Sequence, residues 1–369
     1  MFPGNRAEAG NLSYPGPGGR KMTVRIPVAT PGETLRVDFA TGEILSLPGT
    51  SPIRSASPSG HVLFGGPTLM GGLEYTTFNQ PRSGYGVSGI GNPDGEAFIH
   101  ELGGRINYAT YGGDVLFPVG KFVFGMGYHQ GSGSNREAGQ HAAGGSPGGI
   151  VFIGESNDFG TGLNFGTLGV DIDGWTNVRQ RGGYGKIGLP IPCDDGDSSA
   201  FPYVKVAYSE VDVRQSVNYS TPAFPTQIRS DVFQDLRMNR FSLGLGGFYN
   251  HFLSESFALT VNLEADLHFN SRKLDSNQFI DLFGNTDTVH VQDSDNKTSF
   301  GFLAELGATY YVTPNFGFNL FGRYRHDQFI RADNPLSGND ILAGETTRIG
   351  NGNIDEFTVG MRLIASFGR

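Results

Sequence analysis

A strictly alternating stretch, SFALTVNLEADLHFN at residues 256–270, sets the pattern for much of the chain. Its odd positions from Phe257 to Phe269 are all apolar, and its even positions after Ala258 are all polar. A period of two predicts one extended strand with an apolar face and a polar face. Strands of soluble proteins usually have about five or six residues, whereas a tilted strand that crosses a bilayer needs about 9 to 11. The stretch therefore predicts a transmembrane β-strand.

The alternation recurs through residues 61–369, with connections that are short and long in turn. Short turns are predicted at residues 118–121, 254–255 and 313–314, and long loops at residues 131–147, 222–235, 275–297 and 332–353. Short periplasmic turns and long extracellular loops are typical of bacterial outer-membrane barrels. The pattern predicts an all-β fold, a transmembrane antiparallel up-and-down β-barrel of about 12 strands, with 10 to 14 possible. Three of these strands are placed at residues 149–158, 162–175 and 180–191.

Two strands carry details that the structure can test. In residues 97–117, Phe98, Leu102, Ile106 and Tyr108 are expected to face outward, with Glu101, Arg105 and Asn107 facing inward. In residues 199–221, apolar residues change from even positions, ending at Tyr208, to odd positions, beginning at Val211. This change of parity indicates either a β-bulge or the point where the strand leaves the membrane.

Composition supports a barrel over a helical membrane protein. Glycine supplies 57 of the 369 residues, Phe and Tyr supply 29 and 14, and only 37% of residues are hydrophobic. No run approaches the roughly 18 apolar residues of a transmembrane helix, and in a barrel only every second residue faces lipid. The single tryptophan, Trp175, is expected to anchor a strand end at the membrane interface. A soluble sandwich or propeller is the alternative fold, but it would not need strands of this length.

Residues 1–60 form a separate segment with Pro, Gly and Ser-rich stretches. Between these stretches, Val24, Ile26 and Val28 alternate before a Pro-Gly turn and Leu35, Val37 and Phe39 alternate after it, which predicts a small β-hairpin. The segment is interpreted as a periplasmic extension, with a plug inside the barrel lumen as the alternative. Its first residues lack the basic start and apolar core of a signal peptide, so the numbering is expected to begin near a mature terminus.

The final stretch, FTVGMRLIASFGR, resembles the aromatic-ended last strand by which the barrel-assembly machinery recognises its substrates, although Gly368 and Arg369 follow Phe367 here. On this stretch and on the strand pattern, residues 61–369 resemble the porin-like outer-membrane β-barrel proteins of Gram-negative bacteria. The resemblance implies the bacterial outer membrane as the location. It implies outer-membrane lipid, lipopolysaccharide and the assembly machinery as partners.

Charged residues predicted to face inward narrow the possible functions. Parity places ten of them in the lumen: Glu101, Arg105, Lys205, Glu264, Asp266, His268, Glu305, Arg323, Arg325 and Arg362. Acids gather on the strands of Glu264 and Glu305 and bases on the last two strands, which suggests a field across a narrow, charge-lined passage for small polar or anionic solutes. Alternatively, the charges pair and close the interior, and the protein is a structural or surface-interaction protein acting through its extracellular loops.

Other chemistries are weakly supported by the sequence. A lipid hydrolase would use His129 and Ser132, but their spacing does not match such enzymes, so no enzyme activity is expected. Aspartates of residues 275–297 could bind Ca²⁺, but the segment lacks a full calcium-loop pattern, and neither a metal nor a cofactor is expected. The net charge of −9 and the absence of a Lys/Arg-rich run exclude nucleic acid as a partner, and the single Cys193 excludes an internal disulfide.

Overall fold

The computed structural model describes residues 11–15, 21–25, 34–37, 44–47, 66–87, 98–141, 149–164, 170–193, 198–254, 256–334 and 346–367 and, from residue 66 on, most of their side chains. The chain divides into two compact units, Met1–Pro58 and Ser59–Arg369.

The first unit contains two short antiparallel hairpins. Strand β1 (Asn11–Pro15) pairs with β2 (Lys21–Arg25), and β3 (Thr34–Val37) pairs with β4 (Ile44–Leu47). The sequence predicted one hairpin that joined Val24 to Leu35, and this pairing is wrong, since the two residues lie in different hairpins. Whether the unit is an extension or a plug stays a prediction.

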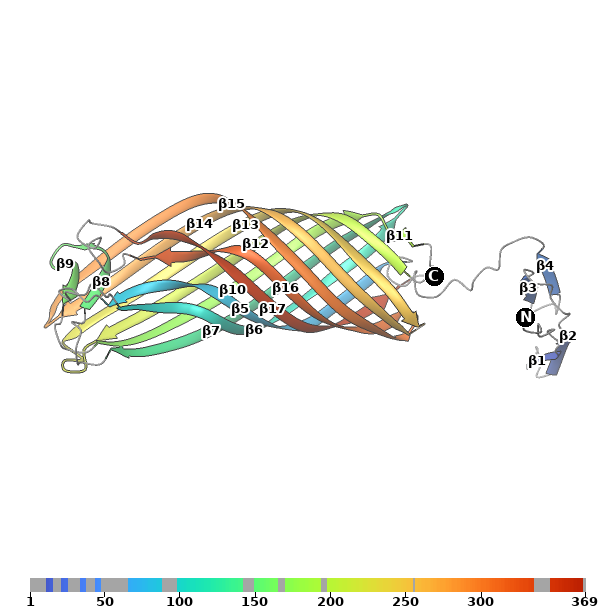
Figure 1. Ribbon diagram of the computed structural model, residues 1–369, viewed down its shortest axis with the longest axis horizontal. Coiled ribbons are helices and arrows are strands. Elements are labelled where there is room, and N and C mark those ends of the chain that lie inside the picture. The colour runs from blue at the N-terminus through green and yellow to red at the C-terminus, as the bar shows by residue number, and fades with distance from the viewer. Residues whose placement is uncertain are drawn as a thin grey trace, which may run out of the picture. The chain divides into compact units, whose positions relative to one another are not determined.

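The second unit is a closed antiparallel barrel, and in its described part ten strands form the ring (Figure 1). In chain order they are β5 (Thr68–Val87), β6 (Phe98–Val119), β7 (Phe122–His141), β10 (Val170–Gly188), β12 (Ser198–Ser220), β13 (Ile228–Ser254), β14 (Phe257–Leu282), β15 (Asn285–Thr313), β16 (Phe316–Asp333) and β17 (Arg348–Ser366). Pairing of β17 with β5 and of β10 with both β7 and β12 closes the ring, and the two-residue strand β11 (Ile191–Pro192) adds to the edge of β12. The predicted fold class is confirmed.

The structure corrects the prediction of three strands within residues 149–191. The segments 162–175 and 180–191 are mostly one barrel strand, β10, which pairs with β12 without a register shift from Asp171 to Gly188. Ahead of it, β8 (Gly149–Ser156) and β9 (Gly160–Asn164) form a separate hairpin. A polar outward face on the upper half of β10 weakened the alternation that the sequence reading relied on.

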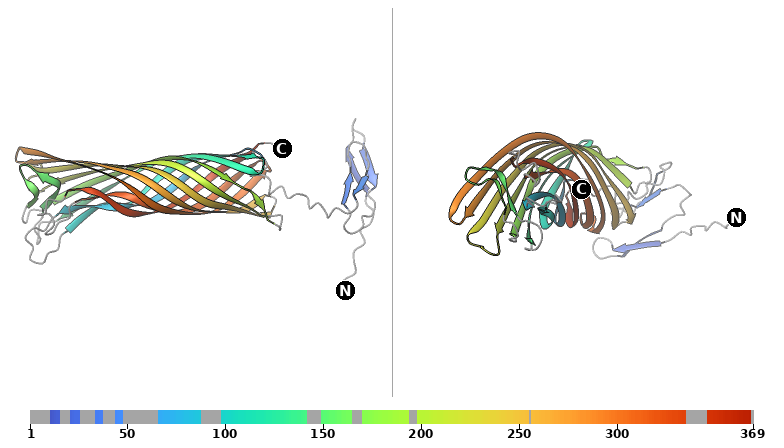
Figure 2. Two further views of the ribbon diagram at one scale, coloured as in Figure 1. Left: turned by 90° about the horizontal axis from the view of Figure 1, so that it is seen from above. Right: turned by 60° about the vertical axis from the view of Figure 1, so that its left-hand side comes forward.

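The two ends of the barrel differ in their connections. At one end, the turn end, the links β6–β7, β13–β14 and β15–β16 are tight, as the sequence predicted. The other end, the loop end, carries the β8–β9 hairpin (Figure 1; Figure 2, left). The predicted long loop at 275–297 is wrong: the segment is the end of β14 and the start of β15, joined by a tight turn in which Phe283 and Gly284 have φ of 53° and 87°.

An apolar band covers the outer face of the barrel toward the turn end. Its upper edge is an aromatic girdle, defined as the exposed outward aromatic side chains at which the outward rows of eight strands change from apolar to polar. Every member is exposed, between 43% and 73%. The girdle comprises Tyr75, Tyr111, Tyr128, Tyr208, Phe241, Phe269, Phe300 and Phe357. On β14 the band runs over residues 257–269, which is long enough for a tilted strand to cross a hydrocarbon core.

Above the girdle the apolar face of the strands changes sides. On β12, Val204, Val206 and Tyr208 are exposed outward, whereas Val211 and Val213 are buried inside the barrel. The register of β12 with β13 is continuous from Ser198 to Ser220, so no bulge causes the change. The parity change therefore marks the point where the strand passes the girdle, the second of the two predicted causes. Below this level the outside is apolar, and above it the inside is apolar.

Trp175 lies on the outer wall above the girdle and not at the membrane interface. It is exposed, and its partners in the ladder are Arg136 and Ser216, both well above the girdle tyrosines Tyr128 and Tyr208 of the same strands. The predicted interfacial anchor is therefore wrong, and the girdle consists of tyrosine and phenylalanine.

No helix among the described residues is long and apolar enough to cross a membrane.

Candidate functional site

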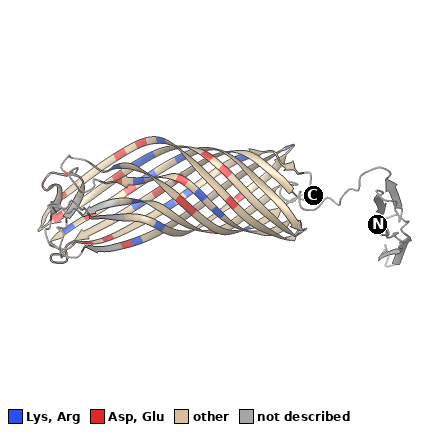
Figure 3. Ribbon diagram, in the orientation of Figure 1, with Lys and Arg blue, Asp and Glu red and all other residues tan. Residues whose placement is uncertain are grey.

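Charged residues are distributed along the barrel strands (Figure 3). Those whose side chains lie on the inner face near the level of the girdle are called the charged belt. Eight of the ten residues predicted to face the lumen lie on the inner face of the barrel. They are Lys205, Glu264, Asp266, His268, Glu305, Arg323, Arg325 and Arg362. Whether they line a passage is a separate matter that depends on how they pair.

The prediction that Arg105 faces the lumen is wrong, and the structure does not place Glu101. Arg105 is exposed on the outer face, and Ile106 and Tyr108 beside it are buried in the interior. The prediction assumed that apolar residues face lipid throughout β6, but this part of β6 lies above the girdle, where the apolar face points inward. The side chain of Glu101 lies outside the described part of the structure.

One cluster of the belt joins strands β5, β15, β16 and β17. Arg362 donates hydrogen bonds to both carboxylate oxygens of Glu305 at 2.7 and 2.8 Å, and Arg323 donates one to Glu74 at 2.6 Å. The guanidinium of Arg362 also lies 3.6 Å from the ring centroid of Phe321. Bidentate pairs and aromatic stacking are the geometry that favours arginine in a buried site. The sequence reading missed Glu74, although its outward neighbours Leu73 and Tyr75 already implied that it faces inward.

A second cluster joins strands β12 and β14. Lys205 bonds to Glu264 and, at 2.9 Å, to Asp266. The hydroxyl of Tyr203 donates to Asn262 or Glu264, with oxygen distances of 2.8 and 3.0 Å. The lysine is therefore held between two carboxylates, which satisfies its charge within the wall.

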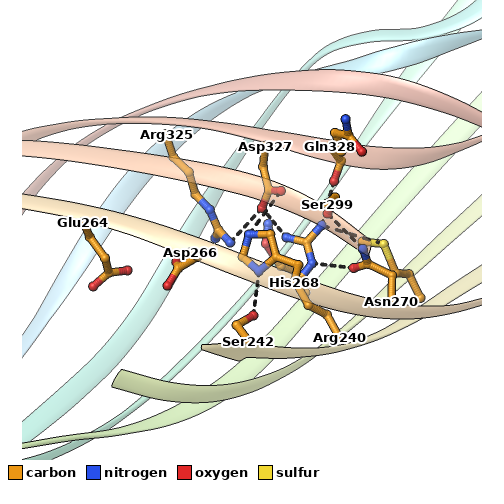
Figure 4. Close-up of polar contacts among 12 residues, drawn as sticks. Arg240, Ser242, Glu264, Asp266, His268, Asn270, Ser299, Arg325, Asp327 and Gln328 are labelled. Atoms are coloured by element: carbon orange, nitrogen blue, oxygen red, sulfur yellow. Dashed lines mark hydrogen bonds and ion pairs between the residues drawn. The ribbon is translucent and has the colours of Figure 1, made fainter. Parts of the chain in front are cut away.

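A third cluster lies slightly above, on strands β13, β14 and β16 (Figure 4). Arg240 bonds to Asp327 and donates to the amide oxygen of Asn270 at 2.9 Å, and Arg325 donates to Asp327 at 3.0 Å. His268 Nδ1 is 2.7 Å from Ser242 Oγ. The sequence predicted His268 and Arg325 but not Arg240 and Asp327.

Ser242, His268 and Asp327 are the three residue types of a hydrolytic triad, but their arrangement does not support catalysis. The carboxylate of Asp327 lies 3.3 Å from His268 Nε2, while the serine contacts Nδ1, which reverses the usual roles of the two nitrogens. All three side chains are buried, with exposure of 3% or less.

The predicted hydrolase pair is also excluded by geometry. His129 lies among the residues that line the interior cavity, whereas Ser132 is exposed on the opposite face of β7. A nucleophile and its base must lie within hydrogen-bond reach of one another, and residues three apart on a strand point to opposite faces.

A cavity of about 230 Å³ lies within the belt. Glu74, Lys186, Lys205 and Arg323 are among its lining residues. Lys186 approaches the rings of Tyr184 and Tyr203, at 5.4 and 5.1 Å from their centroids, but no carboxylate of the described residues lies within ion-pair distance of its amino group. Lys186 is therefore the one belt cation in this part of the structure that pairs with aromatic rings alone.

Glycines on the inner face leave space for the side chains of the belt. A Cβ at Gly125 would lie 2.8 Å from atoms of both Leu116 and Lys186, so these side chains can lie flat against β7 only because that position has none. Such close approach explains much of the high glycine content in barrel strands that would otherwise favour β-branched residues.

Apolar layers border the belt on both sides. Above it lies a core that includes Phe78, Val213, Leu236 and Phe329, and below it lies a smaller cluster that includes Leu116 and Phe201. The ring of Phe78 contacts that of Phe329 edge to face, with centroids 5.1 Å apart. Residues of both clusters, among them Phe201 and Phe329, also line the cavity.

The β8–β9 hairpin covers the loop end of the interior. Phe152 and Ile153 are buried in a further apolar cluster together with Val232 and Ile280 of the wall. The backbone N–H of Ile153 donates to the side chain of Gln278 at 2.8 Å, and its carbonyl accepts from Thr347 at 2.7 Å. The hairpin is thus bonded to both β14 and the start of the β17 region.

Asp287, beside the β14–β15 turn, holds the tip of this hairpin. The hydroxyl of Ser156 and the backbone N–H of Thr288 donate to its carboxylate, and these hydrogen bonds lower the pKa of Asp287 below its ordinary value. The aspartates predicted as possible Ca²⁺ ligands thus lie along two strands and accept hydrogen bonds from neighbouring side chains or backbone N–H groups. The described residues contain no group of three or more His, Cys, Asp or Glu that could hold a metal ion.

These features define the class of the protein. A closed antiparallel barrel with an outward apolar band, an aromatic girdle and polar groups inside the band is a β-barrel of the outer-membrane type.

No protein-family model and no curated protein matches the chain. Among solved structures it is similar to the outer-membrane protease OmpT from Escherichia coli, with 10% identity over 82% of this chain and 97% of that one and a TM-score of 0.41. It is also similar to the translocator domain of the autotransporter NalP from Neisseria meningitidis (10% identity, 82% and 88% covered, TM-score 0.38) and to a Pseudomonas aeruginosa FadL homologue (11% identity, 85% and 94% covered, TM-score 0.27).

Proposed function

We propose that the chain is an outer-membrane barrel with a closed interior that acts at the cell surface through the outer wall of its loop end. The observation that carries the proposal is that most charges of the belt pair with one another, between two apolar clusters and beneath the β8–β9 hairpin. In this arrangement the outer-membrane lipid surrounds the apolar band and the turn end faces the periplasm. The wall above the girdle then stands among lipopolysaccharide, and strand β17 is the segment for the barrel-assembly machinery.

Pairing within the belt argues against a selective field. The acids of β14 and β15 and the bases of β16 and β17, which the sequence separates, reach one another across the interior, as Arg362 does with Glu305. Paired charges cancel at a distance, so they attract no solute. Separating a buried pair costs about 3–5 kcal/mol, so a solute moving through the belt would meet a barrier at each cluster.

The wall is much longer than an anchor requires. Strands β13, β14 and β15 have 27, 26 and 29 residues, whereas a transmembrane strand needs about 9 to 11. From Ser271 to Leu282, β14 continues for about 40 Å beyond the girdle. A rigid wall of this length with its own apolar core is suited to presenting an outer surface at a distance from the bilayer.

Planar-bilayer conductance tests the closed interior. The refolded full-length chain is expected to give no discrete steps at a protein load at which an open porin, inserted from the same detergent, gives many. Folding of the inserted chain is checked by the heat-modifiable gel mobility of barrels. Regular steps of one size from the folded protein would refute the proposal.

A narrow, charge-lined passage for small polar or anionic solutes is the second candidate. The cavity within the belt and the unpaired amino group of Lys186 favour it. This candidate predicts discrete conductance with a preference for anions that Arg323→Glu weakens. Anion-selective steps that Arg323→Glu leaves unchanged would exclude the belt as the selective element.

A further inference from the structure

On strands β10 and β12–β15, the outer wall above the girdle is polar with three aromatic exceptions. Outward positions of β10 and β12–β15 in this region, residues 171–181, 210–220, 229–239, 271–281 and 286–298, contain no aliphatic side chain. The aromatic side chains among these described positions are Trp175, Phe233 and Phe279, which are 43%, 54% and 37% exposed. Exposed rings on a wall from which every aliphatic group is missing require a specific explanation.

Strand register brings the three rings to one patch, which we call the aromatic patch. Trp175 is opposite Ser216, and Ser216 is opposite Phe233, so the first two rings lie in one row, two strands or about 10 Å apart. Phe233 is opposite Asn277, and Phe279 is the next outward residue on that strand, a diagonal neighbour at about 7–8 Å. The rings therefore follow one another across β10, β13 and β14.

The side chains between the rings carry hydroxyl, amide and carboxylate groups. Asn218 donates to Asp231 at 2.5 Å, and Asp231 also pairs with Arg229. On the other side, Arg136 pairs with Asp173 at 2.7 Å, which lowers the pKa of Asp173 and keeps it ionised. These pairs hold polar groups at fixed positions around the rings, where they can exchange hydrogen bonds with a ligand.

This combination fits a sugar chain better than a protein or a lipid. The C–H faces of a pyranose ring pack against the electron-rich face of an aromatic ring, and its hydroxyls need the donors and acceptors that flank the patch. A protein interface would add aliphatic contacts at its core, and a lipid chain requires a continuous apolar surface. Several rings in succession match several linked sugars.

The position of the patch indicates which sugar chain it meets. Phe233 is eight residues above the girdle residue Phe241 on β13, about 27 Å along a strand tilted by about 40°. The patch is on the side wall and not at the tip, where Phe224 and Phe283 contact one another instead. A side wall at this height faces the saccharide part of the neighbouring lipopolysaccharide molecules.

We infer that the aromatic patch of Trp175, Phe233 and Phe279 binds the polysaccharide chain of lipopolysaccharide. The inference rests on the proposed surface role and names the partner of that wall. Binding along the side of the barrel would fix it laterally within the saccharide layer of its own membrane.

Trp175 is the single tryptophan of the chain, so its fluorescence reports on the patch directly. The full-length chain in detergent micelles is titrated with polysaccharide released from lipopolysaccharide by mild acid and freed of lipid A, with dextran of similar length as the comparison. A saturable change in Trp175 emission is expected with the polysaccharide but not with dextran. Phe233→Ala/Phe279→Ala should weaken binding by about tenfold, and Phe224→Ala/Phe283→Ala at the tip should leave it unchanged.

Several results would overturn the inference. These are no saturable change, an equal response to dextran, a response to lipid A vesicles alone, or full binding by the Phe233→Ala/Phe279→Ala variant. Heat-modifiable mobility checks that each variant is folded, and Phe233→Tyr, which keeps a ring, should retain binding. A barrel that conducts ions but binds the polysaccharide would refute the closed interior alone, whereas a silent barrel that ignores the polysaccharide would refute the aromatic patch alone.

Discussion

Arg362→Met removes the arginine that joins two carboxylates across the charged belt. Arg362 bonds to Glu305 through two hydrogen bonds, lies 3.4 Å from Glu74, and stacks on Phe321. Methionine keeps an unbranched apolar body that can adapt to the space beside the phenylalanine, so little cavity is created. The substitution therefore tests the charge pair and not the packing.

The size of the loss in unfolding free energy distinguishes a belt that excludes water from a water-filled one. Glu305 is only 7% exposed, and without Arg362 its nearest cation is Arg323 at 3.9 Å. Removing one partner of a buried pair costs about 3–5 kcal/mol, because the other charge remains buried. Arg323 compensates the charge of Glu305 only in part, so a loss at the lower end of this range is expected. In a water-filled passage the same pair would be screened and worth about 0–1 kcal/mol.

Urea unfolding of the chain in lipid vesicles measures this difference, with Trp175 fluorescence and gel mobility as independent signals. Arg136→Met, which breaks an exposed pair with Asp173 on the outer wall, is the matched control and should leave the unfolding midpoint unchanged. Replacing both members, as Arg362→Met/Glu305→Met, should restore much of the lost stability, since no charge is then left alone. A loss below about 1 kcal/mol for Arg362→Met would refute the sealed belt.

Three further predictions follow from other parts of the barrel. Lys186→Met should raise the urea midpoint, since the buried amino group has no carboxylate partner among the described residues; a fall would reveal a stabilising role for its charge. On intact cells, an impermeant maleimide should label Ser294→Cys on the outer wall but not Cys193 near the turn end, and the opposite result would reverse the proposed orientation. The lowered pKa of Asp287 means that its hydrogen bonds to the hairpin are intact above about pH 4 and are lost as the pH falls through the pKa of the folded state. A fluorophore attached to Asn157→Cys, in a chain without the native cysteine, should therefore gain mobility below that pKa. In the Asp287→Asn variant the same fluorophore should be mobile already at pH 7.

Strand alternation was sufficient to predict the membrane half of the barrel. Once Leu263 and Leu267 face lipid, Glu264, Asp266 and His268 must face inward, because successive side chains of a strand point to opposite faces. The same rule could have found Glu74 between Leu73 and Tyr75. Placing these residues required no knowledge of which strands are neighbours.

Pairing partners inside the belt were beyond the reach of the sequence. Arg240 and Asp327 are 87 positions apart, and their contact depends on the number of strands and on how the ring closes. Arg105 was misplaced for a different reason, since the rule that apolar residues face lipid holds only below the girdle. The upper halves of the strands were read as loops because their outward residues are polar, as they are in segment 275–297.

The change of apolar face at the girdle accounts for the length of the barrel and underlies the closed interior that we propose. Below the girdle the solvent of the outer face is lipid, so apolar side chains point out and the charged groups must pair inside. Above it the solvent is water, so the same strands need an apolar core, and Val211, Leu236 and Phe329 provide one within the ring. A single unbroken register serves both halves, because on β12 the apolar positions change from even to odd between Tyr208 and Val211 while the pairing with β13 continues. The core that lets the wall stand beyond the membrane is therefore the same packing on which the proposed closed lumen depends. An open channel and a tall surface wall are thus competing uses of one interior.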